Sequence, residues 1–273
     1  MDFNFTEEQL SLQDTLNRFI TKDYGFEERR KRVAAGETCN ADIWNTFAEL
    51  GILALPFHED FGGLNGTAMD TYLVMRALAP GLVLEPYVST VILSGTFLQA
   101  AASDEQKASM IEEIAGGGAR YSFAHYEPQS RYQETHVATT AKKDGDNWVL
   151  NGHKAAVLDV KDSDYVLVSA RTSGNTTDAE GISVFRLTPD AAGLQVNSYR
   201  THDGRTAADL ILNNVSVSAD ALIGTEGQAA PAIAQAFAIT NTALVAEATG
   251  LIEALNTATL EYLKIRKQFG VAI

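Results

Sequence analysis

The sequence predicts an α+β protein in three parts, in the order helical, β and helical. Apolar residues recur at helical spacing up to about residue 120, and short runs rich in β-branched and aromatic residues follow. From about residue 228 the chain is alanine-rich, which again favours a helix. We therefore expect a helical domain over residues 1–120, a small β domain over 121–225 and the start of a second helical domain over 226–273.

The first helix is expected to begin at Thr6. The run Thr6-Glu7-Glu8-Gln9 is a capping box, in which the side chains at both ends of the run bond backbone N–H groups. Apolar residues follow at helical spacing and predict one buried stripe, formed by Leu12, Leu16, Phe19 and Ile20.

A second capping box, Ser103-Asp104-Glu105-Gln106, predicts a helix that stops at Gly116-Gly117-Gly118. Because this glycine run follows a helix rather than a strand, it is not a dinucleotide fingerprint. Between the two helices, the glycine-bearing residues 61–66 predict a loop.

The β domain is predicted from alternating and β-branched segments. Residues 137–143 and 148–150 are typical of a hairpin, with its turn at Asp144-Gly145. Further strands are expected at 165–169, 182–187 and 210–217. The polar stretch 172–181 predicts a loop.

Composition narrows the classes of partner. The 273 residues carry a net charge of −14, which disfavours nucleic acid and anionic membranes as partners. Cys39 is the single cysteine, so no internal disulfide is expected, and a reducing cytoplasm suits the chain. We see no export signal and no apolar run near ~18 residues, so we expect no membrane insertion.

The most informative motif closes the alanine-rich segment. Arg266, Gln268, Phe269 and Gly270 spell R-x-Q-F-G. Arginine offers a planar fork of donors that suits a pyrophosphate, and phenylalanine offers a flat apolar face for an adenine. We expect the helix to run to Phe269 and to end at Gly270. A basic last helical turn with a core phenylalanine is the structural alternative.

Three more segments agree with this motif in order. They are residues 44–63 (WNTFAELGILALPFHEDFGG), 121–128 (YSFAHYEP) and 148–154 (WVLNGHK). Together with the opening MDFNFTEEQ, the set resembles the acyl-CoA dehydrogenase family of flavoproteins. The resemblance implies that family's fold, with an N-terminal helical domain, a middle β-barrel-like domain and a C-terminal helical bundle. Because family members continue beyond this point into further helices, we expect the chain to be a fragment with a partial bundle.

The resemblance also implies an activity, which is α,β-dehydrogenation of an acyl-CoA thioester with FAD as cofactor and electron-transfer flavoprotein as acceptor. Fatty-acid, dicarboxylate and steroid side-chain breakdown are the processes in which such enzymes act. The family's carboxylate base usually lies beyond this chain. Its alternative position on the last helix aligns with Thr240, so no catalytic residue is identified here. The nearest carboxylate on that helix, Glu247, is expected on another face.

The flavin-contacting positions depart from the family pattern. Tyr126 stands where a threonine usually bonds the flavin edge. Ala156 replaces the usual packing tryptophan, and Leu158 replaces a threonine near the reactive nitrogen N5. An arginine common early on the last helix aligns with Asn241. The local flavin and substrate pocket is therefore expected to be eroded, or redesigned for a bulkier acyl group.

Arg266, Gln268 and Phe269, in contrast, are kept. In the family this segment reaches across a subunit interface to the adenine and pyrophosphate of the neighbour's FAD. We therefore expect a homo- or hetero-oligomer, dimer or tetramer, with a shared FAD site. Residues 203–210 (DGRTAADL) look similar to the smaller subunits of heteromeric members such as pimeloyl-CoA dehydrogenase. In such a complex the partner would supply the base.

Two other functions stay open. The chain could be a non-catalytic scaffold subunit, or a flavin-dependent monooxygenase on the same fold, which needs no base for the α-proton. The five histidines lack metal-ligand spacing, so no metal site is predicted. Ser122 and Ser130 lack an identifiable nucleophilic triad.

Overall fold

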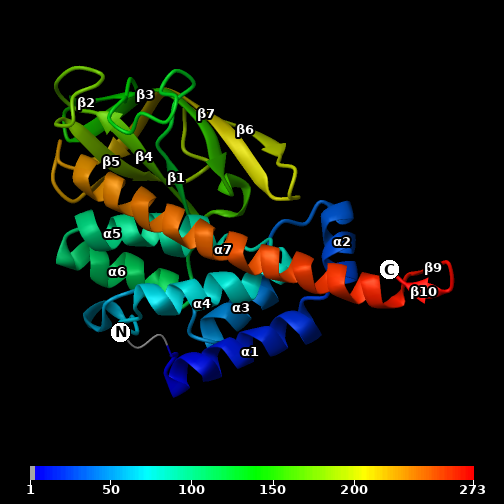
Figure 1. Cartoon of the computed structure of the whole chain (residues 1–273). Helices are drawn as coiled ribbons and strands as arrows, with labels where there is room; N and C mark the ends of the chain where they lie inside the picture. The colour runs from blue at the N-terminus through cyan, green and yellow to red at the C-terminus, as the bar shows by residue number, and fades with distance from the viewer. Residues whose placement is uncertain (1–3) are drawn as a thin grey trace. The chain divides into compact units, whose positions relative to one another are not determined.

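The computed structural model describes residues 4–273 (Figure 1). These residues form two compact units. The first unit contains residues 4–35, 67–83 and 241–273, and the second contains residues 36–66 and 84–240. The long helix α7 (Ala230–Ile265) passes from one unit to the other.

The first unit is helical. Besides the second part of α7, it has α1 (Glu7–Asp23), α2 (Phe26–Ala35), α4 (Ala68–Leu78) and the short 3-10 helix η2 (Ala79–Gly81). The predicted capping box is confirmed, because the Gln9 N–H donates to Thr6 Oγ1 at 3.2 Å while Thr6 N–H donates to Gln9 Oε1 at 3.1 Å. Three members of the predicted stripe are buried, namely Leu16, Phe19 and Ile20, and Leu12 is half-buried.

The second unit contains the first part of α7, and its other helices precede its sheet. They are α3 (Ala41–Glu49), the 3-10 helix η1 (Glu59–Phe61), the π-helix η3 (Val88–Ser94), α5 (Gly95–Ala101) and α6 (Asp104–Ala115). The capping box at Ser103 is confirmed, and Gly116 is the C-cap of α6 as predicted. The predicted loop at 61–66 follows directly on η1, with Phe61 as the last residue of that helix.

An eight-stranded sheet follows. Its strands are β1 (Tyr121–Ala124), β2 (Thr140–Asp144), β3 (Asn147–Leu158), β4 (Tyr165–Arg171), β5 (Ile182–Leu187), β6 (Leu194–Arg200), β7 (Thr206–Ser218) and β8 (Leu222–Ile223). The 3-10 helix η4 (Val160–Asp162) connects β3 to β4, and the 3-10 helix η5 (Ala219–Ala221) connects β7 to β8. The order is β6-β7-β3-β2-β4-β5-β8, and β1 pairs with β4 in parallel. A buried core including Trp148, Phe185 and Leu210 supports the sheet.

Most predicted strands are confirmed, with shifted ends. The hairpin turn consists of Gly145 and Asp146, because Asp144 pairs with Asn147. The strand at 182–187 has the predicted bounds, whereas the predicted strand at 210–217 begins earlier, at Thr206. The last helix was expected to run to Phe269, and this was wrong: α7 ends at Ile265 and a small hairpin follows. Within residues 4–273, no helix combines the length and the apolar character needed to span a bilayer.

Candidate functional site

The R-x-Q-F-G motif forms a hairpin rather than the end of the helix. Strand β9 (Lys267–Gln268) pairs with β10 (Val271–Ala272), and the two residues between them form the turn. Phe269 has φ 51° and Gly270 has φ 84°, the left-handed pair that a type I′ turn requires. Gly270 is therefore the second turn residue and not a helix stop.

Phe269 is an unusual residue for its turn position. Asparagine, aspartate or glycine normally occupies it, because a side chain in the left-handed region costs roughly 1–2 kcal/mol. The strain is tolerated here, and the ring is fully exposed at 103% of its reference area. Strained residues of this kind are concentrated at functional sites.

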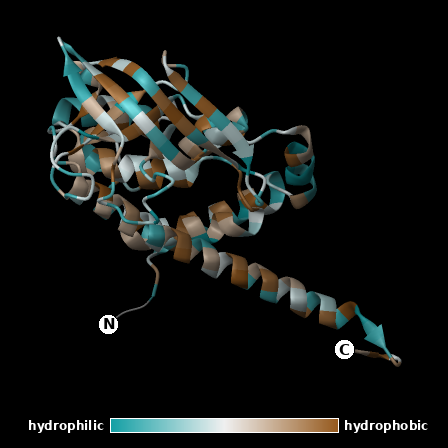
Figure 2. Cartoon of the chain, turned by 90° about the horizontal axis from the view of Figure 1, so that it is seen from above, coloured by the Kyte–Doolittle hydropathy of each residue, from teal (hydrophilic) through white to brown (hydrophobic). Residues whose placement is uncertain are grey.

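The side chains of the two polar motif residues, Arg266 and Gln268, are also available to bind a ligand. Arg266 and Gln268 are exposed, and their side chains have no hydrogen bond or ion pair with any of residues 4–273. The backbone of Arg266 is fixed at both ends, since its N–H donates to the Tyr262 carbonyl at 2.9 Å and its carbonyl accepts from Ile273 N–H at 3.2 Å. The hairpin follows directly on α7 at the end of the chain (Figure 2). Its exposed side chains offer a guanidinium, an amide and an aromatic face to an external ligand.

The other three predicted site residues lie on the sheet, where the ends of β1 and β3 come together. The Ala155 N–H donates to the Tyr126 carbonyl at 2.9 Å, and Ser122 Oγ donates to the Leu158 carbonyl at 2.8 Å. Ala156 and Leu158 are exposed, and Tyr126 is half-buried. The structure therefore brings Tyr126, Ala156 and Leu158 to one region of the second unit.

A β-bulge shapes this region. Lys154 pairs with Leu210 and Val157 pairs with Ala208, so two residues of β3 face Asp209 alone. Ala156, the second of them, is left-handed with φ 54°, and its N–H donates to Asp209 Oδ1 at 3.0 Å. This bulge was not predictable from the sequence, because no glycine marks it.

A fully buried ion pair between Lys154 and Glu127 joins the segment 148–154 to the segment 121–128. Lys154 Nζ donates to Glu127 Oε1 at 2.8 Å, to the His125 carbonyl at 3.0 Å and to Ser169 Oγ at 3.0 Å, so each ammonium proton has an acceptor. Glu127 also accepts from two backbone N–H groups, those of residues 138 and 139, at 2.8 and 2.9 Å. The pair holds the backbone around Tyr126 and Ala156 in place.

The buried groups have shifted pKa values. Burial lowers the pKa of Lys154 to about 8, although Glu127 opposes that shift. Burial alone would raise the pKa of Glu127, but the Lys154 charge and its hydrogen bonds outweigh burial and hold it below the usual value. Burial, then the Lys154 charge, lowers the pKa of His125 to about 3, so its ring is neutral between Ser169 Oγ and the Glu134 carbonyl.

Aromatic rings from β1, from the segment after it and from α7 pack against one another. The ring centroid of Tyr126 lies 5.0 Å from that of Phe237 on α7 and 6.1 Å from that of Tyr132. Phe237 also contacts Phe123 and His125, with centroids 6.2 and 5.5 Å apart. Sequence reasoning did not identify this cluster, because its members come from segments far apart in the chain.

The alternative position of the base contains no acid. Thr240 is buried and its hydroxyl donates to the Ala236 carbonyl at 2.8 Å, within its own helix. Since α7 is continuous and seven residues make almost two turns, Glu247 lies on the same helix face as Thr240. The expectation of another face was wrong, but the two positions are still about 10 Å apart along the axis.

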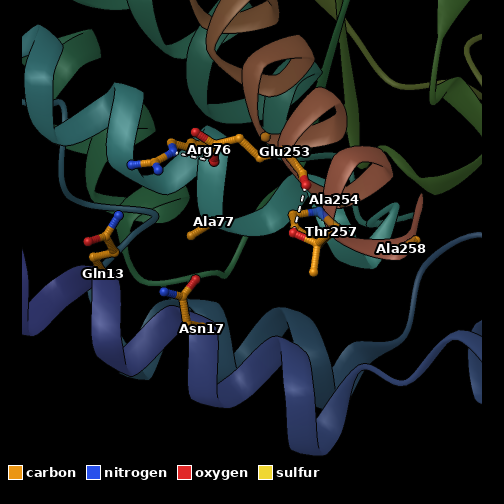
Figure 3. A pocket seen from close by; sticks show the side chains of 10 residues that line it. Gln13, Asn17, Arg76, Ala77, Glu253, Ala254, Thr257 and Ala258 are labelled. Atoms are coloured by element: carbon orange, nitrogen blue, oxygen red, sulfur yellow. Dashed lines mark hydrogen bonds and ion pairs between the residues drawn. The ribbon is translucent and has the colours of Figure 1, made fainter. Parts of the chain in front are cut away.

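The first unit has a cavity of its own, which the sequence did not predict. About 460 Å³ in volume, it is bordered by α1, α4 and α7 (Figure 3). Arg76 Nε donates to Glu253 Oε2 at 2.8 Å at its rim, and Gln13 and Asn17 contribute amides. None of the predicted site residues lines it. Among residues 4–273, no cluster of histidine, cysteine and carboxylate side chains is arranged to hold a metal ion.

Comparison with known proteins decides the family. The family model described as the acyl-CoA dehydrogenase N-terminal domain matches residues 6–118, and that of the middle domain matches residues 122–215. The chain belongs to the acyl-CoA dehydrogenase family. It is 27% identical over 280 residues to the probable acyl-CoA dehydrogenase YngJ of Bacillus subtilis (strain 168), covering 100% of this chain and 73% of that protein.

Solved structures confirm the expected fold of N-terminal helices, middle sheet and helical C-terminal part. Butyryl-CoA dehydrogenase from Megasphaera elsdenii aligns with a TM-score of 0.90 at 24% identity, over 100% of this chain and 73% of that one. A chain from the study of the electron transferring flavoprotein of Acidaminococcus fermentans aligns with a TM-score of 0.89 at 26% identity, over 100% and 72% of the two chains.

Acyl-CoA dehydrogenases are oligomeric oxidoreductases that act on acyl-CoA and use FAD. The two parts of the site fit this cofactor unequally. The exposed hairpin fits, because Arg266 and Phe269 offer unpaired donors and an open aromatic face. The sheet side does not fit, because Ala156 and Leu158 offer only aliphatic side chains at the positions where the resemblance would place polar edges of the flavin.

Proposed function

We propose that this chain is a subunit of an oligomeric acyl-CoA dehydrogenase and takes part in α,β-dehydrogenation of an acyl-CoA thioester in the cytoplasm. Family membership supports the reaction class. The hairpin carries the proposal for this chain, because a strained turn holds Phe269 in solvent beside an unpaired Arg266. Electron-transfer flavoprotein is the proposed acceptor. Acyl groups from fatty-acid, dicarboxylate or steroid side-chain breakdown are the proposed substrates.

The hairpin is proposed to complete the FAD site of a neighbouring subunit. A guanidinium forms paired, charge-assisted hydrogen bonds with phosphate oxygens, and a phenyl face packs on adenine. Because Arg266 and Gln268 have no partner within residues 4–273, these contacts require no existing interaction to break. FAD supplies the hydride acceptor when bound, and the role of this chain is to bind and orient it.

The proton acceptor is proposed to come from elsewhere in the complex. Thr240 has no acid–base capacity near neutral pH, and its hydroxyl is already bonded within α7. A partner subunit with the family carboxylate would supply the base. This arrangement matches the resemblance of residues 203–210 to small subunits of heteromeric members such as pimeloyl-CoA dehydrogenase.

The test is Arg266→Ala in the complex purified from its host. We expect lower flavin content and lower acyl-CoA-dependent reduction of a dye acceptor, because the phosphate contacts are lost. Lys264→Ala is the matched control, since Lys264 is an exposed cation on the preceding turn that pairs only with Glu261 within the described chain. If Arg266→Ala matched this control in both measurements, the proposed role of the hairpin would be wrong.

A non-catalytic scaffold subunit is the second candidate. The internally bonded Thr240, in place of a base, favours it. A scaffold predicts that Arg266→Ala leaves the partner's flavin unchanged, so the same experiment separates the two. For a monooxygenase on this fold, product would form only with oxygen, and anaerobic dye reduction by acyl-CoA would exclude it.

A further inference from the structure

We infer that the sheet side of this chain does not hold a flavin ring, so that its complex carries one flavin for each pair of unlike chains, on the partner's sheet. This inference rests on the proposed function. It arises from a mismatch between the residues around Tyr126 and the polar edges that a bound isoalloxazine would present.

The first part of the mismatch is a shortage of hydrogen-bond partners. The Ala155 N–H is bonded to the Tyr126 carbonyl, and the Ala156 N–H is bonded to Asp209 Oδ1. The Leu158 carbonyl accepts from Ser122 Oγ. These three backbone groups are therefore already bonded, and the side chains of Ala156 and Leu158 add no polar atom. Each flavin edge atom buried without a partner would cost roughly 1–3 kcal/mol.

The second part is the aromatic cluster. Tyr126 occupies the position at which family members usually carry a threonine bonded to the flavin edge. Its ring instead packs against Phe237 and Tyr132. Those contacts hold the phenol ring against α7. A flavin ring would have to displace a packed aromatic contact worth about 0.5–1.5 kcal/mol before making its own.

The third part is charge. The bulge brings the Asp209 carboxylate against Ala156, and the carboxylate also accepts from the Tyr199 hydroxyl at 3.4 Å. A half-buried carboxylate at this place opposes the electron-rich carbonyl edge of a flavin. The buried cation on the same strand, Lys154, does not offset it, because its charge is already paired with Glu127.

The two ends of the chain's site therefore differ in kind. In the hairpin, the side chains of Arg266 and Gln268 are unpaired within residues 4–273 and can bind an external ligand. On the sheet, the polar groups near Ala156 are hydrogen-bonded to one another. A subunit with this combination contacts the FAD that its neighbour binds, but it binds no FAD on its own sheet. The expected flavin count follows directly from that asymmetry.

The experiment is a flavin count on the native complex and on the full chain alone. FAD is released by denaturation and measured by absorbance, and polypeptides are counted by quantitative amino-acid analysis. We expect one FAD for each pair of unlike chains in the complex. We expect none on this chain alone, and no change when free FAD is added to it.

Each outcome is informative. One FAD for every chain, or FAD bound by this chain alone, overturns the inference and leaves the proposed function in place. A complex without any FAD overturns the proposed function, while the absence of a flavin site on this sheet is upheld. One FAD for each pair that is lost in Arg266→Ala, but kept in Lys264→Ala, supports both.

Discussion

The buried pair of Lys154 and Glu127 provides the sharpest test of how this fold is held together. Their side chains are 0% and 1% exposed. Lys154→Met keeps the length of the side chain but removes its charge and three hydrogen bonds, leaving the Glu127 carboxylate buried. Removing one partner of a buried pair typically costs 3–5 kcal/mol, a large part of the 5–15 kcal/mol that stabilises a domain. We expect a loss of about 3–5 kcal/mol for Lys154→Met.

The assay is urea unfolding of the full chain, followed by tryptophan fluorescence. Both tryptophans, Trp44 and Trp148, lie in the same unit as the pair. Lys143→Met is the matched control, because Lys143 is exposed. Its pair with Glu226 contributes about 0–1 kcal/mol, and its ammonium over the Trp148 ring, 4.9 Å from the centroid, contributes about 0.5–1 kcal/mol.

A double variant completes the test. In Lys154→Met/Glu127→Gln the unpaired charge is gone, and the amide oxygen still accepts a backbone N–H. The double variant should therefore lose less stability than the sum of the two single losses, with a coupling energy above about 1 kcal/mol. Additive losses, or a Lys154→Met loss no larger than that of Lys143→Met, would refute the reasoning.

Two further predictions concern the same unit and its neighbour. Below pH 6.5 the unfolded chain protonates His125 while the folded chain, with a pKa of about 3, does not, so the free energy of unfolding falls as pH falls through this window. The contribution of His125 to this fall is up to about 1.4 kcal/mol per pH unit, and we expect His125→Asn to remove it. The measurement is the urea midpoint at several pH values between about 4 and 7. The same dependence of the midpoint on pH in His125→Asn as in the unmodified chain would contradict the prediction. A Cβ on Gly63 would lie 2.0 Å from the Phe57 carbonyl oxygen, so Gly63→Ala should cost about 1–3 kcal/mol, whereas Gly25→Ala, with no atom within 4 Å, should cost little. Equal thermal midpoints for the two variants would show that the loop adapts.

Elements with a local signal were predictable from the sequence. The capping boxes at Thr6 and Ser103 and the strand at 182–187 depend on neighbouring residues, and the structure confirms all three. Strand β6 was missed because it lies at one end of the sheet, where most of its residues are exposed and polar. Strand β1 was missed because all four of its residues are buried, so it shows no alternation.

The hairpin at Phe269 was missed for a different reason. A type I′ turn is normally recognised by asparagine or aspartate before glycine, and phenylalanine gives no such signal. The motif itself was found from chemistry and order along the chain, so the residues were named correctly while their backbone was not. The bulge at Ala156 was missed for the same reason, because an alanine in the left-handed conformation cannot be recognised from the sequence as a glycine can.

The division between buried and exposed positions explains how a chain with this fold can vary the residues expected to contact the flavin. Along β3, Lys154 points into the core and bonds Glu127, whereas Ala156 and Leu158 are exposed. Along the preceding segment, Glu127 is buried and Tyr126 is only half-buried. Substitution at the exposed positions therefore leaves the ion pair untouched, and the backbone keeps its place. A TM-score of 0.90 with butyryl-CoA dehydrogenase shows that the backbone fold is shared, whereas the proposed flavin count depends on the exposed residues.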